Sequence, residues 1–295
     1  MFRHFHERRI AVPGTEIFLR QGGDGPPLLL LHGYPQTHAM WHKVAPVLAR
    51  RFTVVCPDLR GYGASGKPPT DPDHTPYSKR AMAGDMVAVM EELGFPRFLL
   101  AGHDRGGRVA HRLCLDHPDR VHRAAVLDIV PTRTLFESVD REIAAGYYHW
   151  FFLIQPDPLP ERLIGGDPLF YLHWTLGRWS GGAADSFAPE ALEAYEQAFS
   201  DPATIHATCE DYRAAAGIDL VHDAADANQR IACPLLVLWG AKGFMDRRFD
   251  MLAVWRDKAV GPVTGRALPC GHFLPEEAPE ETVRELVAFF LADGP

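Results

Sequence analysis

Apolar and polar positions along this chain follow the alternation of strands and helices that is typical of α/β proteins. Residues 9–20 alternate around Pro13-Gly14, which predicts a hairpin, and residues 27–31 are entirely apolar, as in a strand buried on both faces. Further strands are expected, in chain order, at residues 52–56, 98–101, 124–129, 234–240 and 263–268. Because helical segments separate these strands, the pattern predicts a mostly parallel, doubly wound sheet.

Helical periodicity is clearest between Ser78, a candidate N-cap, and Gly94. The apolar positions that recur there at helical spacing are Met82, Met86, Val89, Met90 and Leu93. A last helix is expected from about Pro279. Between residues 131 and 225 the strand pattern stops, and aromatic-rich helical stretches broken by prolines and glycine pairs replace it. We therefore expect an α/β core formed by residues 1–131 and 226–295, with an inserted helical cap at residues 132–225.

Length, charge and cysteine usage narrow the classes of protein that fit this pattern. The 295 residues allow one main core with an insertion, and the formal net charge of -8 argues against a nucleic-acid partner, which needs clustered positive charge. No apolar run is long enough to span a membrane and the first residues are polar rather than signal-like, so a cytoplasmic location is predicted. The five cysteines lack metal-ligand spacing and are expected to be reduced, mostly buried thiols.

One short motif matches a dinucleotide site, but its context does not. Gly61 to Gly66 fit G-x-G-x-x-G, yet Lys67-Pro68-Pro69 follow directly. Prolines there cannot open the helix whose N-terminus would hold a pyrophosphate. We therefore predict that this segment is a loop.

The strongest chemical signal lies at residues 99–108, where an apolar strand runs into Gly-His-Asp-Arg-Gly-Gly-Arg. An Asp after a strand is often only a helix N-cap. The small residues Gly102, Gly106 and Gly107 on both sides of Asp104 instead favour a nucleophile elbow, whose strained turn needs them. A carboxylate at this position suits attack on saturated carbon, which gives an alkyl ester of the enzyme that water later cleaves.

Two further segments stand where an α/β hydrolase places the partners of its nucleophile. His32-Gly33-Tyr34-Pro35 follows the buried strand, so the backbone N–H groups of Tyr34 and Arg105 are candidates for the oxyanion hole. His272 lies beyond the last expected strand and before the final helix, as the general base of this fold does. A simple turn is the structural alternative for each segment.

The acid that would orient His272 is less regular. Gly243 occupies the place, three residues after the strand glycine, where many proteins of this fold carry the acid. Asp128 ends an apolar strand, where a carboxylate needs a polar partner, and we favour it over a cap or turn role. The nearby but offset Asp246 is the second choice.

Two arginines on the helix of the elbow indicate an acidic substrate. Arg105 and Arg108 lie one turn apart, and guanidinium groups fork onto carboxylates through charge-assisted hydrogen bonds. A solvated helix face is the alternative. In the expected cap, residues 147–150 (Tyr-Tyr-His-Trp) and Tyr212 supply N–H and O–H donors that could stabilise a departing halide. Taken alone, this group fits ordinary aromatic packing better.

These segments together resemble the fluoroacetate dehalogenases, or haloacetate dehalogenases, of the α/β-hydrolase superfamily over nearly the whole chain. The resemblance rests on residues 32–37, 102–108, 127–131, 149–150, 212 and 271–273. It implies the following roles: nucleophile, Asp104; base and supporting acid, His272 and Asp128; carboxylate binding, Arg105 and Arg108; halide binding, His149, Trp150 and Tyr212; and a pocket position, Trp179. It also implies a homodimer. Tyr34 departs from the Phe expected in this family and would make the pocket more polar.

The expected protein is a hydrolase acting on carbon-halide bonds, which converts a haloacetate to glycolate and halide through an Asp104 ester. Its expected partner is a small halogenated carboxylate, and the chemistry needs no cofactor and no metal. An epoxide hydrolase with the same Asp-His-Asp triad and cap tyrosines is the main alternative, although paired arginines have no role on a neutral epoxide. A haloalkane dehalogenase is disfavoured for the same reason. A hydrolase-fold receptor without turnover is the alternative from another class.

Overall fold

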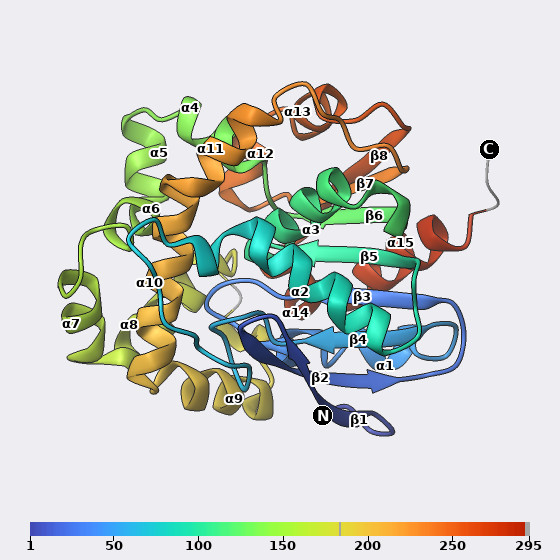
Figure 1. Cartoon of the computed structure of the whole chain (residues 1–295), viewed down its shortest axis with the longest axis horizontal. Helices are drawn as coiled ribbons and strands as arrows, with labels where there is room; N and C mark the ends of the chain where they lie inside the picture. Colours follow the sequence, from blue (N-terminus) through green and yellow to red (C-terminus); the bar gives the residue numbers. More distant parts are fainter. Residues whose placement is uncertain (183, 293–295) are drawn as a thin grey trace.

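The computed structural model describes residues 1–182 and 184–292 and contains an eight-stranded sheet in the order β1-β2-β4-β3-β5-β6-β7-β8 (Figure 1). The strands are β1 (His6–Val12), β2 (Thr15–Gly22), β3 (Pro27–Leu31), β4 (Thr53–Pro57), β5 (Phe98–His103), β6 (Val121–Leu127), β7 (Leu235–Gly240) and β8 (Val263–Leu268). Strand β2 runs antiparallel to both of its neighbours, and every other pair in the sheet is parallel. The predicted hairpin and the mostly parallel sheet are therefore confirmed.

The helices outside the long insertion are α1 (Ala45–Leu48), α2 (Lys79–Glu92), α3 (Arg105–Asp116), α12 (Phe244–Arg248), α13 (Met251–Asp257), α14 (Leu274–Glu277) and α15 (Pro279–Phe290). Three short 3-10 helices join them: η1 (His38–Trp41), η2 (Thr75–Tyr77) and η3 (Pro118–Arg120). Helices α2 and α3 pack together over the face of the sheet that is turned to the viewer in Figure 1. Ser78 caps α2 by accepting from the N–H of Ala81, and Gly94 ends the turn beyond it at φ 81°, as the sequence predicted.

The helical insertion, as we call helices α4 to α11, separates β6 from β7. It comprises α4 (Thr132–Glu137), α5 (Arg141–Gly146), α6 (Tyr148–Phe152), α7 (Leu159–Gly165), α8 (Pro168–Trp179), η4 (Ala184–Ser186), α9 (Pro189–Phe199), α10 (Pro202–Ala216) and α11 (Ile218–Ala225). In Figure 1 these helices gather on the left of the molecule, beyond the ends of the central strands. Residues 104, 128 and 272 follow the carboxyl ends of β5, β6 and β8, so the insertion covers the edge where they lie.

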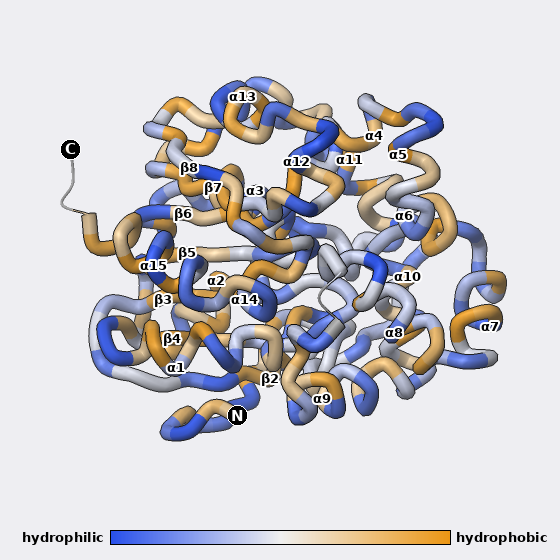
Figure 2. Tube along the Cα trace, turned by 180° about the vertical axis from the view of Figure 1, so that it is seen from behind, coloured by the Kyte–Doolittle hydropathy of each residue, from blue (hydrophilic) through white to orange (hydrophobic). Residues whose placement is uncertain are grey.

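The core of the sheet is apolar because its central strands are covered on both faces. Every residue of β4 and β5 is buried, and Figure 2 shows hydrophobic colours along the central strands. Strand β6 begins three residues earlier and ends two residues earlier than expected, because Asp128 leaves the strand conformation at φ 53°. The Gly61 to Gly66 segment is a loop, as predicted, and Gly61 and Gly63 have positive φ angles there.

The five cysteines are free thiols, and all but Cys233 are buried. Across residues 1–182 and 184–292, each helix is too short or too polar to cross a lipid bilayer.

Candidate active site

The turn between β5 and α3 holds Asp104 in a strained conformation, with φ 47° and ψ -115°. The positions two residues before and two residues after it must be glycine because the backbone segments approach very closely. A Cβ atom on Gly102 would lie 2.3 Å from the carbonyl oxygen of Gly106, and one on Gly106 would lie 2.3 Å from that of His32. The turn therefore has the geometry of a nucleophile elbow, and although Asp104 stands at the N-cap position of α3, its side chain makes no capping hydrogen bond to that helix.

The Asp104 carboxylate has one held oxygen and one that faces the candidate base. Oδ1 accepts the backbone N–H of Tyr34 at 2.9 Å, while Oδ2 lies 3.8 Å from Nε2 of His272. Burial raises the pKa of Asp104, but the positive charges of His272 and of the two arginines outweigh it and lower the pKa. An ionised Oδ2 is thus available for attack. No contact from the backbone N–H of Arg105 to Asp104 is seen in the described part of the chain, so its oxyanion role stays a prediction.

His272 and Asp128 meet as the sequence predicted, although 144 positions separate them. Nδ1 of His272 lies 2.6 Å from Oδ2 of Asp128, whose Oδ1 accepts the backbone N–H of Gly240 at 3.0 Å. Burial lowers the pKa of His272, but the hydrogen bond and charge of Asp128 raise it, and the pKa ends above 6.5. Asp246 instead accepts the indole N–H of Trp239 at 2.6 Å.

The position of Gly243 explains why an acid can sit at either place. A Cβ on Gly243 would lie 3.6 Å from Oδ1 of Asp128, so a side chain there would enter the same space. In this chain the contact with His272 comes from Asp128, directly after β6.

Both arginines of α3 are buried, and each has nitrogen atoms to spare. Arg105 places Nε and Nη2 on the carboxylate of Asp211 at 2.9 and 2.8 Å, and its Nη1 has no partner among the residues described. Arg108 donates Nη1 to the carbonyl oxygen of Val130 at 2.7 Å, while Nε and Nη2, its side-on fork, are unpartnered there. Burial and the charge of Arg105 lower the pKa of Arg108 to about 10, so it is charged at neutral pH. The solvated-face alternative is wrong.

Asp211 is the residue that sequence reasoning missed. It lies on α10, is fully buried, and also binds Nζ of Lys79 and the hydroxyl of Tyr62, the latter at 2.6 Å. Burial raises its pKa, but Arg105 and Lys79 lower it well below the usual range. The only sequence signal was its place beside Tyr212. Acids also stand at several other positions of the same segment, so the signal singles out no partner.

The three candidate halide donors of the insertion form one cluster with the arginines. The ring of Tyr212 lies 5.7 Å from those of His149 and Trp150, and the Arg105 guanidinium stands 4.0 Å over it. Within residues 1–182 and 184–292, His149 Nδ1, Trp150 Nε1 and the Tyr212 hydroxyl are buried without a hydrogen-bond partner. Burial lowers the pKa of His149 to about 3, so its imidazole is neutral. Buried polar atoms normally find partners, so three unpartnered side chains that lie together beside Asp104 suit a small polar ligand.

A cavity of about 490 Å³ lies beside this cluster and reaches it at His149. Its inner wall includes Asp104, His149, Trp179 and His272, and the Trp179 ring meets those of His149 and His272 at 4.4 and 5.5 Å. Arg105, Arg108, Trp150 and Tyr212 lie in the buried layer behind that wall rather than on it. The mouth carries Glu142 and three exposed cations, Arg178, Lys242 and Arg247.

Comparison with known proteins agrees with this geometry. A family model described as alpha/beta hydrolase fold matches residues 26–279. A fluoroacetate dehalogenase from Burkholderia sp is 49% identical over 294 residues, which cover 100% of this chain and 96% of that protein. The chain belongs to the fluoroacetate dehalogenase family of the α/β-hydrolase superfamily. It is therefore a hydrolase, of a family named for cleavage of a carbon-halogen bond.

Other relatives show how this dehalogenase family stands among the α/β hydrolases. A crystal structure of a protein of this fold from Nostoc sp PCC 7120 superposes with a TM-score of 0.98 at 56% identity, covering 99% of this chain and 100% of the other. A soluble epoxide hydrolase from Corynebacterium sp. (strain C12) is 33% identical over 95% of both chains. The chain is thus similar both to a dehalogenase and, at lower identity, to an epoxide hydrolase.

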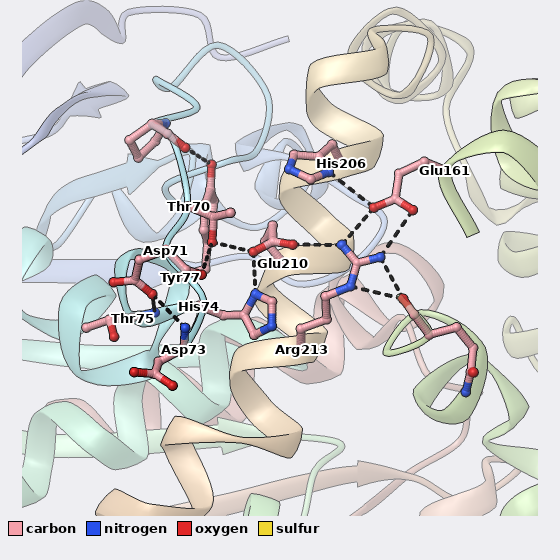
Figure 3. A network of polar contacts seen from close by, with 12 residues as sticks. Thr70, Asp71, Asp73, His74, Thr75, Tyr77, Glu161, His206, Glu210 and Arg213 are labelled. Carbon is pink, nitrogen blue, oxygen red and sulfur yellow. Dashed lines mark hydrogen bonds and ion pairs between the residues drawn. The ribbon is translucent and has the colours of Figure 1, made fainter. Parts of the chain in front are cut away.

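A second polar network of this dehalogenase-family chain lies outside the cavity (Figure 3). Glu161 of α7 meets Arg213 at 2.7 Å and His206 at 3.1 Å, both from α10. With Asp157, the side chains of Glu161 and His206 place three metal-ligand atoms within 4.8 Å of one another. Because Arg213 already neutralises Glu161, we assign this group a structural role, which is to join α7 to α10.

Proposed function

We propose that this protein hydrolyses a haloacetate, fluoroacetate or chloroacetate, to glycolate and halide. The observation that carries the proposal is the set of buried donors without partners, within the described residues, beside an ionised Asp104. These donors are Nη1 of Arg105, Nε and Nη2 of Arg108, Nδ1 of His149, Nε1 of Trp150 and the hydroxyl of Tyr212. A small anion with a carboxylate at one end and a departing halide at the other would satisfy both groups of donors.

In the first step, Oδ2 of Asp104 attacks the α-carbon of the haloacetate. The new carbon–oxygen bond forms as the carbon–halogen bond breaks, and the halide leaves toward His149, Trp150 and Tyr212. Oδ1 cannot compete easily because the Tyr34 N–H holds it at 2.9 Å. The side-on fork of Arg108 and Nη1 of the other arginine hold the substrate carboxylate during the attack.

In the second step, Nε2 of His272 takes a proton from water, which attacks the Cγ atom of the Asp104 ester. The oxyanion that forms there receives the Tyr34 N–H and, by our proposal, that of Arg105. Collapse of this intermediate expels the glycolate alkoxide oxygen, which takes the proton back from His272, and the new carboxyl group of Asp104 loses its proton to solvent and becomes the carboxylate again. The negative charge of Asp104 helps to raise the pKa of His272. Esterification removes that charge and so lowers the pKa, which favours the neutral imidazole that the second step needs as its base.

Two measurements test this mechanism. An ion-selective electrode follows fluoride and chloride release from matched two-carbon acids, with Asp104→Asn as the inactive control. A single turnover in heavy-oxygen water should give unlabelled glycolate and labelled Asp104. Label in the glycolate of the first turnover would show direct attack by water and would refute the covalent route.

The halide site has its own test. Fluoride leaves carbon poorly, so the loss of one donor should slow fluoroacetate more than chloroacetate, by on the order of 3 kcal/mol in the barrier for fluoride. We expect this result for His149→Ala. Equal slowing of both substrates would mean that His149 does not bind the halide.

An epoxide hydrolase is the second candidate, because an epoxide hydrolase is 33% identical and Tyr147 lines the cavity, while Tyr212 lies buried beside His149. Two tyrosines could protonate the alkoxide of an opened epoxide. The buried, charged Arg108 opposes this reading, since a neutral epoxide leaves its fork without a partner. Assaying diol formation from a small neutral epoxide separates the two functions, and we expect none.

We also propose that the chain consists of a core and an inserted cap. Residues 1–131 and 226–295 form the core that supplies the nucleophile, the base and the acid, and residues 132–225 form a cap. The cap supplies the halide donors and Trp179, which lines the cavity between His149 and His272.

We propose a homodimer that forms through the cap. Exposed apolar side chains gather on the adjacent helices α7 and α8: Leu159, Leu163, Leu169, Phe170 and Trp174. Exposed apolar side chains on two neighbouring helices are costly in water and favour burial against a second copy of the chain. Light scattering after size exclusion should give a dimer for the native chain and a monomer for Phe170→Glu combined with Trp174→Glu. A native monomer would refute the proposal.

A further inference from the structure

The carboxylate of Glu277 bridges the peptide groups on both sides of the candidate base. Its Oε2 accepts the backbone N–H of Gly271 at 2.7 Å, and its Oε1 accepts that of Phe273 at 2.9 Å. Glu277 is the last residue of the single-turn helix α14 and is only partly exposed. Both oxygens are thus used to fix the chain immediately before and after His272.

The remaining groups of the same peptide are held by other elements. The N–H of His272 donates to the carbonyl oxygen of Trp179, at the end of α8, at 2.9 Å, and its carbonyl oxygen lies 2.7 Å from Nε2 of His103. A Cβ on Gly271 would stand 2.4 Å from the backbone nitrogen of Gly181. The base therefore sits on a peptide wedged between the insertion and the elbow, and Glu277 closes the third side.

Ordinary helix capping is the simpler reading of Glu277, since a Glu near a helix start often bonds back to the cap residue. Such a cap satisfies one N–H with one oxygen. Glu277 satisfies two N–H groups that flank a catalytic candidate, whereas its neighbour Glu276 turns to the hydroxyl of Tyr195 at 2.5 Å and takes no part.

We propose that Glu277 is the positioning residue that aims Nε2 of His272 at the water for ester hydrolysis. This inference rests on the proposed function. His272 acts only in the second step of that mechanism, so Glu277 should govern hydrolysis of the Asp104 ester and leave halide release by Asp104 intact. A purely structural cap would show no such division between the two steps.

The test compares Glu277→Gln with Glu280→Gln, a matched change at an exposed residue in the first turn of α15. Rapid-quench measurements follow halide and glycolate separately, and intact mass spectrometry detects the ester. We expect Glu277→Gln to release one halide per active site at the native rate and then to turn over about 10- to 100-fold more slowly, with the ester accumulating. Glu280→Gln should behave as the native protein does.

A second variant separates geometry from charge. Glu277→Asp keeps the charge but is too short to reach both N–H groups, so ester hydrolysis should again be slow. It also serves if Glu277→Gln does not fold. Equal slowing of both steps, or native turnover of Glu277→Asp, would overturn the proposal.

The pH profile tests the charge of Glu277 separately from its two hydrogen bonds. Burial lowers the pKa of His272, while the charges of Asp128, Asp104 and Glu277 raise it, and His103 beside it is neutral, with a pKa of about 3. The midpoint for ester hydrolysis should therefore fall in Glu277→Gln and stay in Glu277→Asp. If His272→Asn traps no ester from a haloacetate, the proposed function itself fails, whatever Glu277 does.

Discussion

The buried ion pair between Asp211 and Arg105 links the stability of the insertion to the recognition of substrate. Asp211→Asn keeps the volume of the side chain and removes the charge that Arg105 and Lys79 share. Removing one partner of a buried pair costs about 3 to 5 kcal/mol, because the other charge stays buried without compensation. For a chain of this size, each kcal/mol lowers Tm by about 2 to 4 °C, so we expect a decrease of about 6 to 20 °C.

The same substitution should weaken substrate binding. Two nitrogens of Arg105 lie on Asp211, and this contact directs the third, Nη1, which has no partner among the described residues and could meet a carboxylate. Losing one charge-assisted hydrogen bond costs about 1.5 to 3 kcal/mol, which corresponds to a rise in KM of about 10- to 150-fold. Calorimetry gives Tm, and halide release at varied haloacetate concentration gives KM and kcat.

Asp219→Asn is the matched control for this experiment. Asp219 is also buried on the insertion and accepts the backbone N–H of Lys79 at 2.8 Å, but it makes no hydrogen bond to Arg105 in the described residues. It should lower Tm without changing KM. If Asp211→Asn melts earlier yet binds haloacetate as the native protein does, then Asp211 does not position Arg105 for a carboxylate.

Three further outcomes are expected. Ester hydrolysis should rise with pH as His272 loses its proton, with a midpoint below the pKa of His272 in the resting enzyme because the ester lacks the Asp104 charge that raises it; a rate that falls with pH would exclude a neutral base. Replacing Arg178, Lys242 and Arg247 together by Gln should raise KM about two- to tenfold at low salt and make KM less dependent on salt, because exposed charges attract an anion only when salt does not screen them. If the salt dependence of KM did not change, these three cations would not attract the substrate. Gly33→Ala should abolish turnover, because its Cβ would lie 2.4 Å from the Cβ of the elbow aspartate; a folded, active variant, judged by circular dichroism and halide release, would contradict this.

Local conformation could be read from the sequence because its causes are local. The elbow needs glycines within four residues of Asp104, the N-cap of α2 needs a hydroxyl beside its first turn, and buried strands need apolar runs. The same signals gave the expected order of strands and helices. Strand ends differed by a few residues, as at Asp128, where the turn depends on the neighbouring strand: its N–H donates to the carbonyl oxygen of Leu238 at 2.8 Å.

Only the folded structure explains why Asp128 rather than Asp246 contacts His272. Fold order alone placed His272 and an acid at the same edge of the sheet, but which carboxylate reaches Nδ1 depends on how β6 and β7 lie beside each other. That Gly243 lies beside the Asp128 carboxylate is likewise known only from the three-dimensional structure.

By itself, then, the sequence determined the α/β-hydrolase fold, the elbow and the set of residues around it, since short-range sterics and chain order specify these. Only the tertiary structure decided which nitrogen atoms of Arg105 and Arg108 are occupied and which are free. Asp211 lies 106 positions from Arg105, and Glu277 acts through backbone N–H groups that no side-chain pattern records. Pairing of buried charges depends on which distant elements pack together, and this property belongs to the whole fold rather than to any local segment.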